Sequence, residues 1–293
     1  MKLNILITGA TGFVGSSLAK SLAGHNLFLL THTEAVDKNV SAAWITQDLT
    51  KPLRLAELPK NLDIIIHEAA KVGRDVAEGD EEAWRVNIEA TRQLLEYGKK
   101  ARITKFMFAS TSAIYGYNQN PSTEETRPNP ANYYAKTKLE AEKIVKKYSS
   151  YFDTLIFRYF YPYGPGQRRG LQKIISRVLR KEPLIIYNQG ENPKTNPIYI
   201  DDLARLTIKS FGLKGSHVIN IGGSEIASIK EIAEIAAGLL GKKPVYDFRE
   251  DKSITNEIGD ISRMKELLGV SETHLKEGLR MVLLENTQEK FKS

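Results

Sequence analysis

Three glycines spaced three residues apart stand near the start of the chain, directly after an apolar run. The run is Leu3–Ile7, and the glycines are Gly9, Gly12 and Gly15. A strand that ends in such glycines and then opens a helix brings backbone N–H groups close to a phosphate, with no side chain in the way. The segment predicts a dinucleotide-binding turn. Because the spacing differs from the commoner G-x-G-x-x-G fingerprint, an ordinary strand-to-helix turn stays an alternative.

The composition is that of a globular protein. The chain has 293 residues, of which 41% are hydrophobic and 26% charged, and this length allows a large core. No segment has the apolar length that a membrane-spanning helix needs, and the chain enters its first strand without a cleavage site. We therefore expect a cytoplasmic protein with no membrane partner.

The number and spacing of cysteines and histidines limit the kinds of site that the chain can form. The chain has no cysteine, which excludes disulfides and thiol catalysis, and its five histidines are too scattered to suggest a metal cluster. The formal net charge of +7 is spread along segments in which Lys and Glu alternate, as in Lys138–Lys143. The cysteine and histidine usage predicts no metal site. Because the Lys/Glu pattern is typical of a solvated helix face, we expect no nucleic-acid partner, while a small phosphorylated ligand is compatible with the charge.

Strand-like and helix-like segments alternate through the first half of the chain. The strand-like segments are 5–8, 27–30, 43–46, 64–67 and 105–110, and the helix-like segments are about 14–23, 82–100 and 133–148. Such alternation produces right-handed crossovers between parallel strands. The pattern predicts an α/β fold with a doubly wound Rossmann-type parallel sheet, which binds ligands at the carboxyl ends of its strands.

The composition changes after the apolar stretch 154–160. Residues 161–170 are rich in Gly and Pro, and we interpret them as a loop that leaves the sheet. A helix-like segment near 171–181 and a strand-like segment near 184–187 follow. We predict two parts: a dinucleotide-binding Rossmann domain over 1–163, to which 196–222 return, and a smaller C-terminal substrate-binding α/β region over 164–293.

Tyr134 and Lys138 stand four residues apart, on one face of a helix that Asn132 could cap. Tyrosine is normally too weak an acid for proton exchange at neutral pH. A neighbouring ammonium favours the phenolate and lowers the pKa of Tyr134 towards the range that general acid–base catalysis needs. Tyr133 lacks such a partner, because its neighbour four residues on is Thr137. A Tyr and a Lys that merely share an exposed helix face are the alternative.

Hydroxyl side chains gather where one apolar strand-like run ends. Ser110, Thr111 and Ser112 follow the run 106–109. At the carboxyl end of a strand, such a hydroxyl can bind a substrate oxygen and help to pass its proton to Tyr134. For the two serines, satisfying nearby backbone groups is the alternative.

Taken together, these segments resemble the extended short-chain dehydrogenase/reductase superfamily, in particular its NAD-dependent epimerase/dehydratase family. The resemblance covers nearly the whole chain. It is carried by motifs whose order and separation are together specific: Gly9-x-x-Gly12-Phe13-x-Gly15, Asp48-Leu49, Ile64–Ala70, Asn87, Ser110–Gly116, Tyr134-x-x-x-Lys138, Arg158–Gln167, Ile198–Asp202 and Asp260–Gly269.

The resemblance implies a nicotinamide cofactor, NAD or NADP, and a catalytic set of Thr111, Tyr134 and Lys138. Hydride would move between a substrate carbon and the nicotinamide. The resemblance also implies contacts to the cofactor from Gly9, Thr11, Gly12, Phe13, Val14, Gly15, Thr31, His32, Asp48, Leu49, Ala69, Ala70, Lys71, Asn87, Tyr134, Lys138, Tyr161 and Pro162. Contacts to the substrate are expected from Ser112, Tyr161, Lys194 and Arg249.

The first departure from the family pattern concerns the cofactor. NAD-selective members end their second strand with an Asp that binds the ribose 2′-OH, whereas the corresponding segment here ends in Thr31-His32-Thr33. The missing carboxylate removes a barrier to the 2′-phosphate of NADP, and His32 stands where NADP-using relatives often carry Arg. A surface-loop histidine without a ligand is the alternative. We expect little discrimination between the two cofactors, or a slight preference for NADP.

The second departure concerns the substrate. Tyr161 stands where sugar-nucleotide members carry a substrate-contacting Asn, and Thr195 stands where they carry an Arg for the substrate diphosphate. Lys194 is next to Thr195, but Lys binds phosphate only as a point charge. Other candidates for the missing cation are Arg168, Arg169 and Arg249, for which ordinary exposed arginines are the alternative.

The third departure concerns the reaction. Dehydratases of the family follow the catalytic Thr with an acidic pair, whereas Thr111 is followed by Ser112 and Ala113. Elimination through such a pair is excluded, and epimerisation or simple carbonyl reduction remains. We predict an NAD(P)-dependent epimerase or reductase that acts on a nucleoside-diphosphate sugar.

Two other functions stay open. Thr195 and Tyr161 favour an NAD(P)H-dependent ketone reductase whose substrate has no diphosphate. A non-catalytic dinucleotide-binding regulator is the other, although such proteins commonly lack the catalytic Tyr or Lys that this chain has. By analogy with relatives, the helices around Asn87 and Tyr134 could form the interface of a homodimer.

Overall fold

The computed structural model describes residues 2–33, 40–73, 75–190 and 193–290, with the backbone alone for 285–290. The chain divides into two compact units. Unit 1 comprises Met1–Ile114, Pro128–Arg158 and Thr207–Ile219, and unit 2 comprises Tyr115–Arg127, Tyr159–Leu206 and Asn220–Ser293. Part of the segment 196–222 thus lies in unit 1. The domain boundaries given above stay a prediction.

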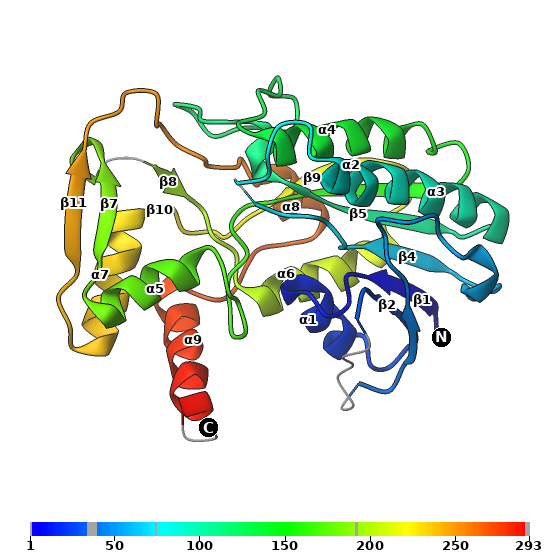
Figure 1. The fold of residues 1–293 in the computed structure, drawn as a ribbon, viewed down its shortest axis with the longest axis horizontal. Helices are drawn as coiled ribbons and strands as arrows, with labels where there is room; N and C mark the ends of the chain where they lie inside the picture. The colour runs from blue at the N-terminus through cyan, green and yellow to red at the C-terminus, as the bar shows by residue number, and fades with distance from the viewer. Residues whose placement is uncertain (1, 34–39, 74, 191–192, 291–293) are drawn as a thin grey trace. The chain divides into compact units, whose positions relative to one another are not determined.

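A seven-stranded sheet forms the centre of the fold (Figure 1). Its strands, in spatial order, are β3 (Ala43–Thr46), β2 (Asn26–Thr31), β1 (Asn4–Thr8), β4 (Ile64–His67), β5 (Lys105–Thr111), β6 (Asp153–Tyr159) and β9 (His217–Ile221). The pairs from β3 through β5 are parallel. The chain order reverses between β1 and β4, which is the switch point where doubly wound sheets bind ligands. The predicted fold class is confirmed.

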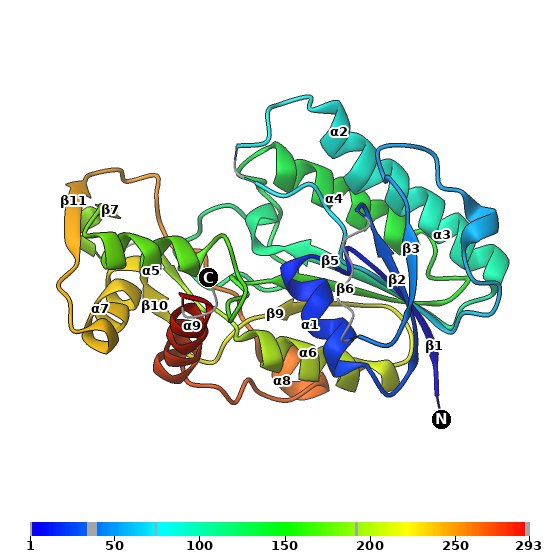
Figure 2. The same ribbon diagram turned by 60° about the horizontal axis from the view of Figure 1, so that its bottom comes forward.

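Helices cover both faces of this sheet in unit 1. Three of them lie on one face, and α1 (Phe13–Ser21) lies on the other (Figures 1 and 2). The three are α2 (Glu81–Trp84), α3 (Ala90–Ala101) and α4 (Tyr133–Lys146). A buried apolar cluster that includes Ile65, Leu94, Phe106 and Val145 joins the sheet to this helical layer. Burial of such side chains is the main stabilising contribution, at about 25 cal/mol per Å² of apolar surface.

The predicted helix over 82–100 is interrupted in one place. Residues Arg85–Glu89 form a π-helical turn between α2 and α3, while the backbone dihedral angles stay right-handed on both sides. A π-turn inserts one extra residue and is found frequently at functional sites. Here it carries Asn87, which is fully buried.

Unit 2 contains two small sheets and several helices. Strand β7 (Pro183–Tyr187) pairs in parallel with β11 (Val245–Arg249), and β8 (Lys194–Thr195) pairs antiparallel with β10 (Ala227–Ser228). The helices are α5 (Leu171–Arg180), α6 (Ile200–Lys209, which continues into unit 1), α7 (Ile229–Leu240), α8 (Ser262–Leu267) and α9 (Leu275–Lys290). Short 3₁₀ turns lie at Leu55–Glu57, Ser112–Ile114, Asn188–Gly190 and Ser210–Gly212. In the part of the chain that the structure describes, no helix is long and apolar enough to cross a membrane.

Candidate active site

The glycine turn follows β1 and requires glycine at two positions. Gly9 has φ +66°, and a Cβ atom there would lie 2.7 Å from the backbone nitrogen of Ala69. At Gly15, a Cβ atom would lie 2.2 Å from the carbonyl oxygen of Gly9. Both distances are far below van der Waals contact, so the chain path between β1 and α1 depends on these two residues.

The start of α1 is suited to an anion. Gly12 is the N-cap and provides no side-chain cap, and its own N–H donates to the carbonyl oxygen of Gly9 at 2.9 Å. The first N–H groups of a helix, here those of Phe13 and Val14, have no intrahelical acceptor and carry the positive end of the helix dipole. This cradle, in which added Cβ atoms would collide, fits the pyrophosphate of a dinucleotide.

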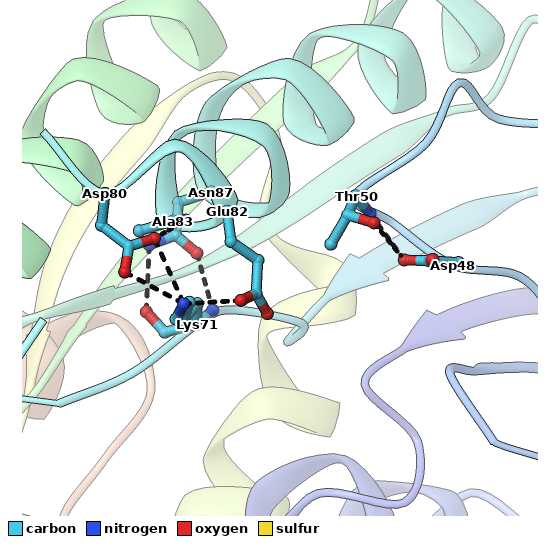
Figure 3. A network of polar contacts seen from close by, with 7 residues as sticks. All are labelled: Asp48, Thr50, Lys71, Asp80, Glu82, Ala83 and Asn87. Atoms are coloured by element: carbon cyan, nitrogen blue, oxygen red, sulfur yellow. Dashed lines mark hydrogen bonds and ion pairs between the residues drawn. The ribbon is translucent and has the colours of Figure 1, made fainter.

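The ends of β2 and β3 bring together a second group of predicted cofactor contacts. The Oγ1 atoms of Thr11 and Thr31 lie 3.4 Å apart. The Nδ1 atom of His32 lies 3.6 Å from Oδ1 of Asp48. The hydroxyl and the N–H of Thr50 both donate to this Asp48 carboxylate, at 2.6 and 2.9 Å, and they lower its pKa (Figure 3). An acidic group therefore lies beside His32, although it belongs to the loop after β3. Leu49, which follows it, is buried.

Asn87 holds the backbone of the loop that follows β4. Its Oδ1 accepts from the N–H of Lys71 at 2.8 Å, and its Nδ2 donates to the carbonyl oxygen of Lys71 at 3.1 Å (Figure 3). The same Nδ2 donates to Oγ1 of Thr137 on α4 at 2.9 Å. The predicted cofactor contacts Ala69, Ala70 and Lys71 thus belong to a loop that the amide of Asn87 fixes in place.

The side chain of Lys71 points into an ion-pair network. Its Nζ lies 3.0 Å from Asp80 and 2.6 Å from Glu82 (Figure 3). Both contacts raise the pKa of Lys71, with Glu82 the larger cause. Asp80 also caps α2 by accepting from the N–H of Ala83. The ammonium is therefore engaged at the start of α2.

Thr111 and Tyr134 come from two elements of unit 1. Thr111 ends β5, and Tyr134 lies in the first turn of α4, which Asn132 caps by accepting from the N–H of Ala135 at 2.9 Å. The hydroxyl of Thr111 lies close enough to Tyr134 to lower the pKa of its phenol. Ser112 follows in a 3₁₀ turn and is buried.

The pKa of Tyr134 moves in the direction opposite to the expected one. Burial raises it to about 12, and the nearby hydroxyl of Thr111 opposes this change. Glu68 adds a smaller rise through its negative charge. The prediction that Lys138 brings this pKa towards neutrality is wrong for the protein in this state, because removal from water favours the uncharged phenol more strongly.

Lys138 is only 1% exposed, and burial lowers its pKa to about 7. The charges of Glu68 and Glu142 oppose that shift. The exposed-face alternative for Tyr134 and Lys138 is therefore excluded. Glu68, which follows His67 at the end of β4, is a group near both catalytic candidates that the sequence analysis did not single out.

A buried ion pair below α4 was also missed. Arg158 on β6 donates to both carboxylate oxygens of Glu142, at 3.0 and 2.7 Å, and Ser110 donates to Oε1 at 2.5 Å. All three side chains are at most 3% exposed. The signal that could have found this pair is that Glu142 lies four residues after Lys138 and therefore on the same helix face. Ser110 binds a side chain here and not the backbone group that the alternative proposed.

The remaining predicted contacts lie in unit 2. Tyr161 has φ +44°, which is rare for a residue other than Gly, and its hydroxyl donates to Oε2 of Glu257 at 2.7 Å. The N–H of Glu257 donates to the carbonyl oxygen of Lys194 at 2.9 Å, so Glu257 connects two predicted substrate contacts. Glu257 is 8% exposed and was not predicted. Pro162, next to Tyr161, accepts a hydrogen bond from Gln167 through its carbonyl oxygen.

Arg249 does not join this group as a free cation. It ends β11, where its guanidinium donates to Asp247 at 2.7 Å, and its side chain is 54% exposed. Arg168 and Arg169 are also exposed. Thr195 is buried in β8, and its hydroxyl has no hydrogen-bond partner among the described residues.

Known proteins of similar sequence and structure were compared with this chain. The model of the NAD dependent epimerase/dehydratase family matches residues 5–222. A protein of Bacillus subtilis (strain 168) named "Uncharacterized UDP-glucose epimerase YtcB" is 32% identical over 94% of this chain and 96% of its own. The UDP-glucuronate 4-epimerase of Thermodesulfobacterium geofontis is 32% identical over 94% of this chain and 93% of its own.

Solved structures lead to the same family. The UDP-glucuronic acid 4-epimerase of Bacillus cereus, in complex with UDP-glucuronic acid and NAD, has a TM-score of 0.87 and 29% identity, and the similarity covers 98% of this chain and 100% of that one. The family match runs from β1 to the end of β9 and includes the glycine turn, the end of β5 and α4. The chain belongs to the NAD dependent epimerase/dehydratase family of the extended short-chain dehydrogenase/reductases.

Proposed function

We propose that this protein is an NAD-dependent epimerase that acts on a UDP-sugar. The observation that carries the proposal is that Thr111 lies close enough to Tyr134 to lower the pKa of its phenol, with the buried Lys138 one turn further along α4. The relatives described above bear the names of UDP-sugar epimerases, which supports both the reaction and the substrate class.

The residues that would hold the dinucleotide come from three strand ends of unit 1. The N–H groups of Phe13 and Val14 would bind the pyrophosphate, and the loop 69–71 would lie along the ribose. A bound NAD would supply the acceptor and donor for the hydride that leaves the substrate carbon and returns to it. The Bacillus cereus epimerase was solved in complex with NAD, which supports NAD over the slight preference for NADP that we expect from β2. The carboxylate of Asp48 beside His32 agrees with that choice.

Three side chains would take part in proton transfer: Thr111, Tyr134 and Lys138. In its phenolate form, Tyr134 would take a proton from a substrate hydroxyl and later return it, while the hydroxyl of Thr111 orients the same substrate oxygen. Because burial holds the phenol neutral, the cationic form of Lys138 is what favours removal of its proton. The Lys138 side chain sits near its own titration point and is therefore sensitive to small changes in its surroundings.

The residues after Thr111 favour epimerisation over elimination. Ser112 and Ala113 offer no acidic pair, so loss of water has no general acid and base at this place. Oxidation followed by return of hydride to the opposite face needs only one acid–base group. Substrate contacts from Tyr161, Lys194 and Arg249 in unit 2 form part of the proposal, supported by the Glu257 connection for the first two.

A pair of variants tests the proposal. Tyr134→Phe removes the acid–base oxygen, and we expect turnover of UDP-glucose or UDP-glucuronate to fall by about 10²–10⁴-fold while NAD still binds. Tyr133→Phe is the matched control, because Tyr133 is the adjacent residue and lines a hollow with Trp84 and Arg85. Undiminished turnover by Tyr134→Phe would exclude the mechanism.

Substrate screening separates the alternatives. Conversion of a UDP-sugar to its epimer with catalytic NAD supports the proposal, whereas consumption of NADPH with a ketone that has no diphosphate supports a reductase. Dinucleotide binding with no hydride transfer to any of these compounds supports a regulator.

We also propose a homodimer, on the family analogy given above, and a cytoplasmic location, on the sequence features given above. Light scattering on the purified protein measures its mass in solution. A mass of one chain excludes the dimer under those conditions.

A further inference from the structure

His67 is a fully buried histidine with no role in the mechanism above. It is the last residue of β4, the strand that pairs with β1, and each of its ring nitrogens contacts one hydroxyl group. Nδ1 lies 2.7 Å from Oγ1 of Thr8, and Nε2 lies 2.8 Å from Oγ1 of Thr91. Thr8 directly precedes the glycine turn, and Thr91 lies on α3.

The neighbouring hydrogen bonds determine where the ring carries its proton. The hydroxyl of Thr91 donates to the carbonyl oxygen of Asn87 at 2.8 Å, so its single hydrogen is used and it must accept from His67. Nε2 therefore carries the hydrogen, and Nδ1 accepts from Thr8. The oxygen of Thr8 in turn accepts from the N–H of Ala69 at 3.2 Å. Every donor in this series of hydrogen bonds has one acceptor.

The environment keeps His67 neutral. Burial lowers its pKa to about 3, and the charge of Lys138 acts in the same direction. The rings of Phe106 and Phe108 pack against the imidazole, with centroids 6.1 and 5.7 Å away. A protonated ring would place a second N–H against the hydroxyl of Thr8 and break the order of donors and acceptors.

Beyond Thr91, the same series of contacts continues through Asn87 to α4, the helix that carries Tyr134. The amide of Asn87 donates to Oγ1 of Thr137, and Thr137 donates to the carbonyl oxygen of Tyr134 at 2.7 Å. The two sides of the imidazole thus lead to different parts of the site. Nδ1 leads to the glycine turn and Ala69, and Nε2 leads to Asn87 and the first turn of α4.

We infer that His67 is a positioning residue that holds the dinucleotide turn through Nδ1 and the backbone of the acid–base helix through Nε2. The inference rests on the proposed function, because it assigns these two parts to cofactor binding and to proton transfer. It predicts that substitutions can remove the hydrogen bond with Thr8 and the hydrogen bond with Thr91 one at a time, with different effects on function.

Each of two substitutions at His67 is chosen to keep one of its two side-chain hydrogen bonds and to remove the other. The amide oxygen of His67→Asn can accept from Thr8 near the position of Nδ1, and the amide nitrogen of His67→Gln can donate to Thr91 near the position of Nε2. Loss of one buried hydrogen bond corresponds to about a tenfold effect. We expect His67→Gln to weaken NAD binding about tenfold with little change in kcat, and His67→Asn to lower kcat about tenfold with little change in the Kd for NAD.

The measurements are the Kd for NAD by calorimetry, kcat with a UDP-sugar, and thermal unfolding without ligand. His217→Asn is the control, because this histidine lies on β9 and its Nε2 contacts the carbonyl oxygen of Lys214. A merely structural role predicts that both variants lower the unfolding temperature and change Kd and kcat in the same proportion, and that result overturns the inference. Unchanged constants in both variants overturn it as well.

Nitrogen NMR of the wild-type protein gives a readout that needs no folded variant. We expect the Nε2–H tautomer of His67, with no titration between about pH 5.5 and 8. An Nδ1–H tautomer or a titrating ring overturns the inference. If the wild type binds NAD but converts no UDP-sugar, the proposed function fails, and the Kd values of the two variants alone decide the role of His67. A wild type that does not bind NAD overturns both.

Discussion

The ammonium nitrogen of Lys138 lies 3.9 Å from the centre of the Phe108 ring, on the buried side of α4. The face of the ring attracts the cation, yet burial still lowers the pKa of Lys138 to about 7. The fold therefore holds a poorly hydrated amine one helical turn after Tyr134. Burial of such a group reduces the stability of the fold.

Replacement of this lysine by an apolar side chain is expected to stabilise the fold. The ordinary pKa of Lys138 is 10.5 and its folded value is about 7, so below pH 7 the group is charged in both states and folding carries the full desolvation cost. As pH rises from 7 to 10.5, the folded state loses its proton first and the cost disappears. We expect Lys138→Met to gain about 1 kcal/mol at pH 6, or roughly 2–4 °C in Tm, and to lose activity.

The control for this prediction is Lys136→Met. Lys136 lies two residues earlier on α4, half exposed and paired with Glu78 at 2.9 Å. Thermal unfolding at pH 6 and pH 9 measures both variants. A gain for Lys138→Met that is larger at pH 9 than at pH 6 would contradict the assigned cause.

The buried pair of Glu142 and Arg158 predicts a large loss on breaking it. Glu142→Ala leaves the guanidinium of Arg158 buried beside no carboxylate from α4, and we expect a loss of about 3–5 kcal/mol in the free energy of unfolding. The double variant Glu142→Leu/Arg158→Met replaces both charges by apolar groups and should recover most of that loss. Urea denaturation measures each, with Glu140→Ala, which is exposed and pairs with Lys143, as control. Equal losses in the single and double variants would argue against an uncompensated charge as the cause.

The glycine turn predicts a contrast between two small substitutions. In Gly15→Ala, the new methyl group would lie 2.2 Å from the carbonyl oxygen of Gly9, so the start of α1 must move. We expect NAD binding to be lost or weakened at least about tenfold. Gly24→Ala meets nothing within 4 Å and should bind NAD like the wild type. Calorimetric titration with NAD compares them, and retained affinity in Gly15→Ala would show that the turn is not the pyrophosphate site.

Asp48 predicts the preference between NAD and NADP. Its carboxylate lies 3.6 Å from the ring of His32, and hydrogen bonds from Thr50 lower its pKa, so the negative charge is present at neutral pH. A negative charge at this place opposes a 2′-phosphate. We expect the wild type to prefer NAD and Asp48→Asn to reduce that preference by about tenfold, mainly through tighter binding of NADP. The Kd values of both proteins for NAD and NADP, measured by calorimetry, test this preference. A wild type that binds NADP more tightly than NAD would contradict the prediction.

Much of this site could be predicted from the sequence because it depends on short-range spacing. The turn at Gly9, Gly12 and Gly15 follows an apolar strand directly. The four-residue spacing of Tyr134 and Lys138 places them on one helix face whatever else the chain does. The hydroxyl of Thr111 lies at a strand end, and parallel strands end at one edge of the sheet.

Other features depend on which distant residues become neighbours. The partner of Tyr161 is Glu257, almost a hundred positions away, and nothing near Tyr161 in the sequence indicates it. The pairing of Arg249 with Asp247 is by contrast local, since the two residues are two positions apart on β11 and therefore on the same face of the strand. Asn87, which contacts Lys71 and Thr137, lies in a π-turn that periodicity does not reveal.

By itself, the sequence determined the order of strands and helices, the glycine turn after β1 and the four-residue spacing that places Tyr134 and Lys138 on one helix face. Each of these follows from backbone geometry over a few residues. Tertiary structure alone decided the charge states and the partners of the site: the raised pKa of Tyr134, the lowered pKa of Lys138 and the neutral ring of His67. The physical reason is that a side chain's titration depends on its removal from water and on nearby charges, and the packing of β4, β5, β6 and α4 sets both.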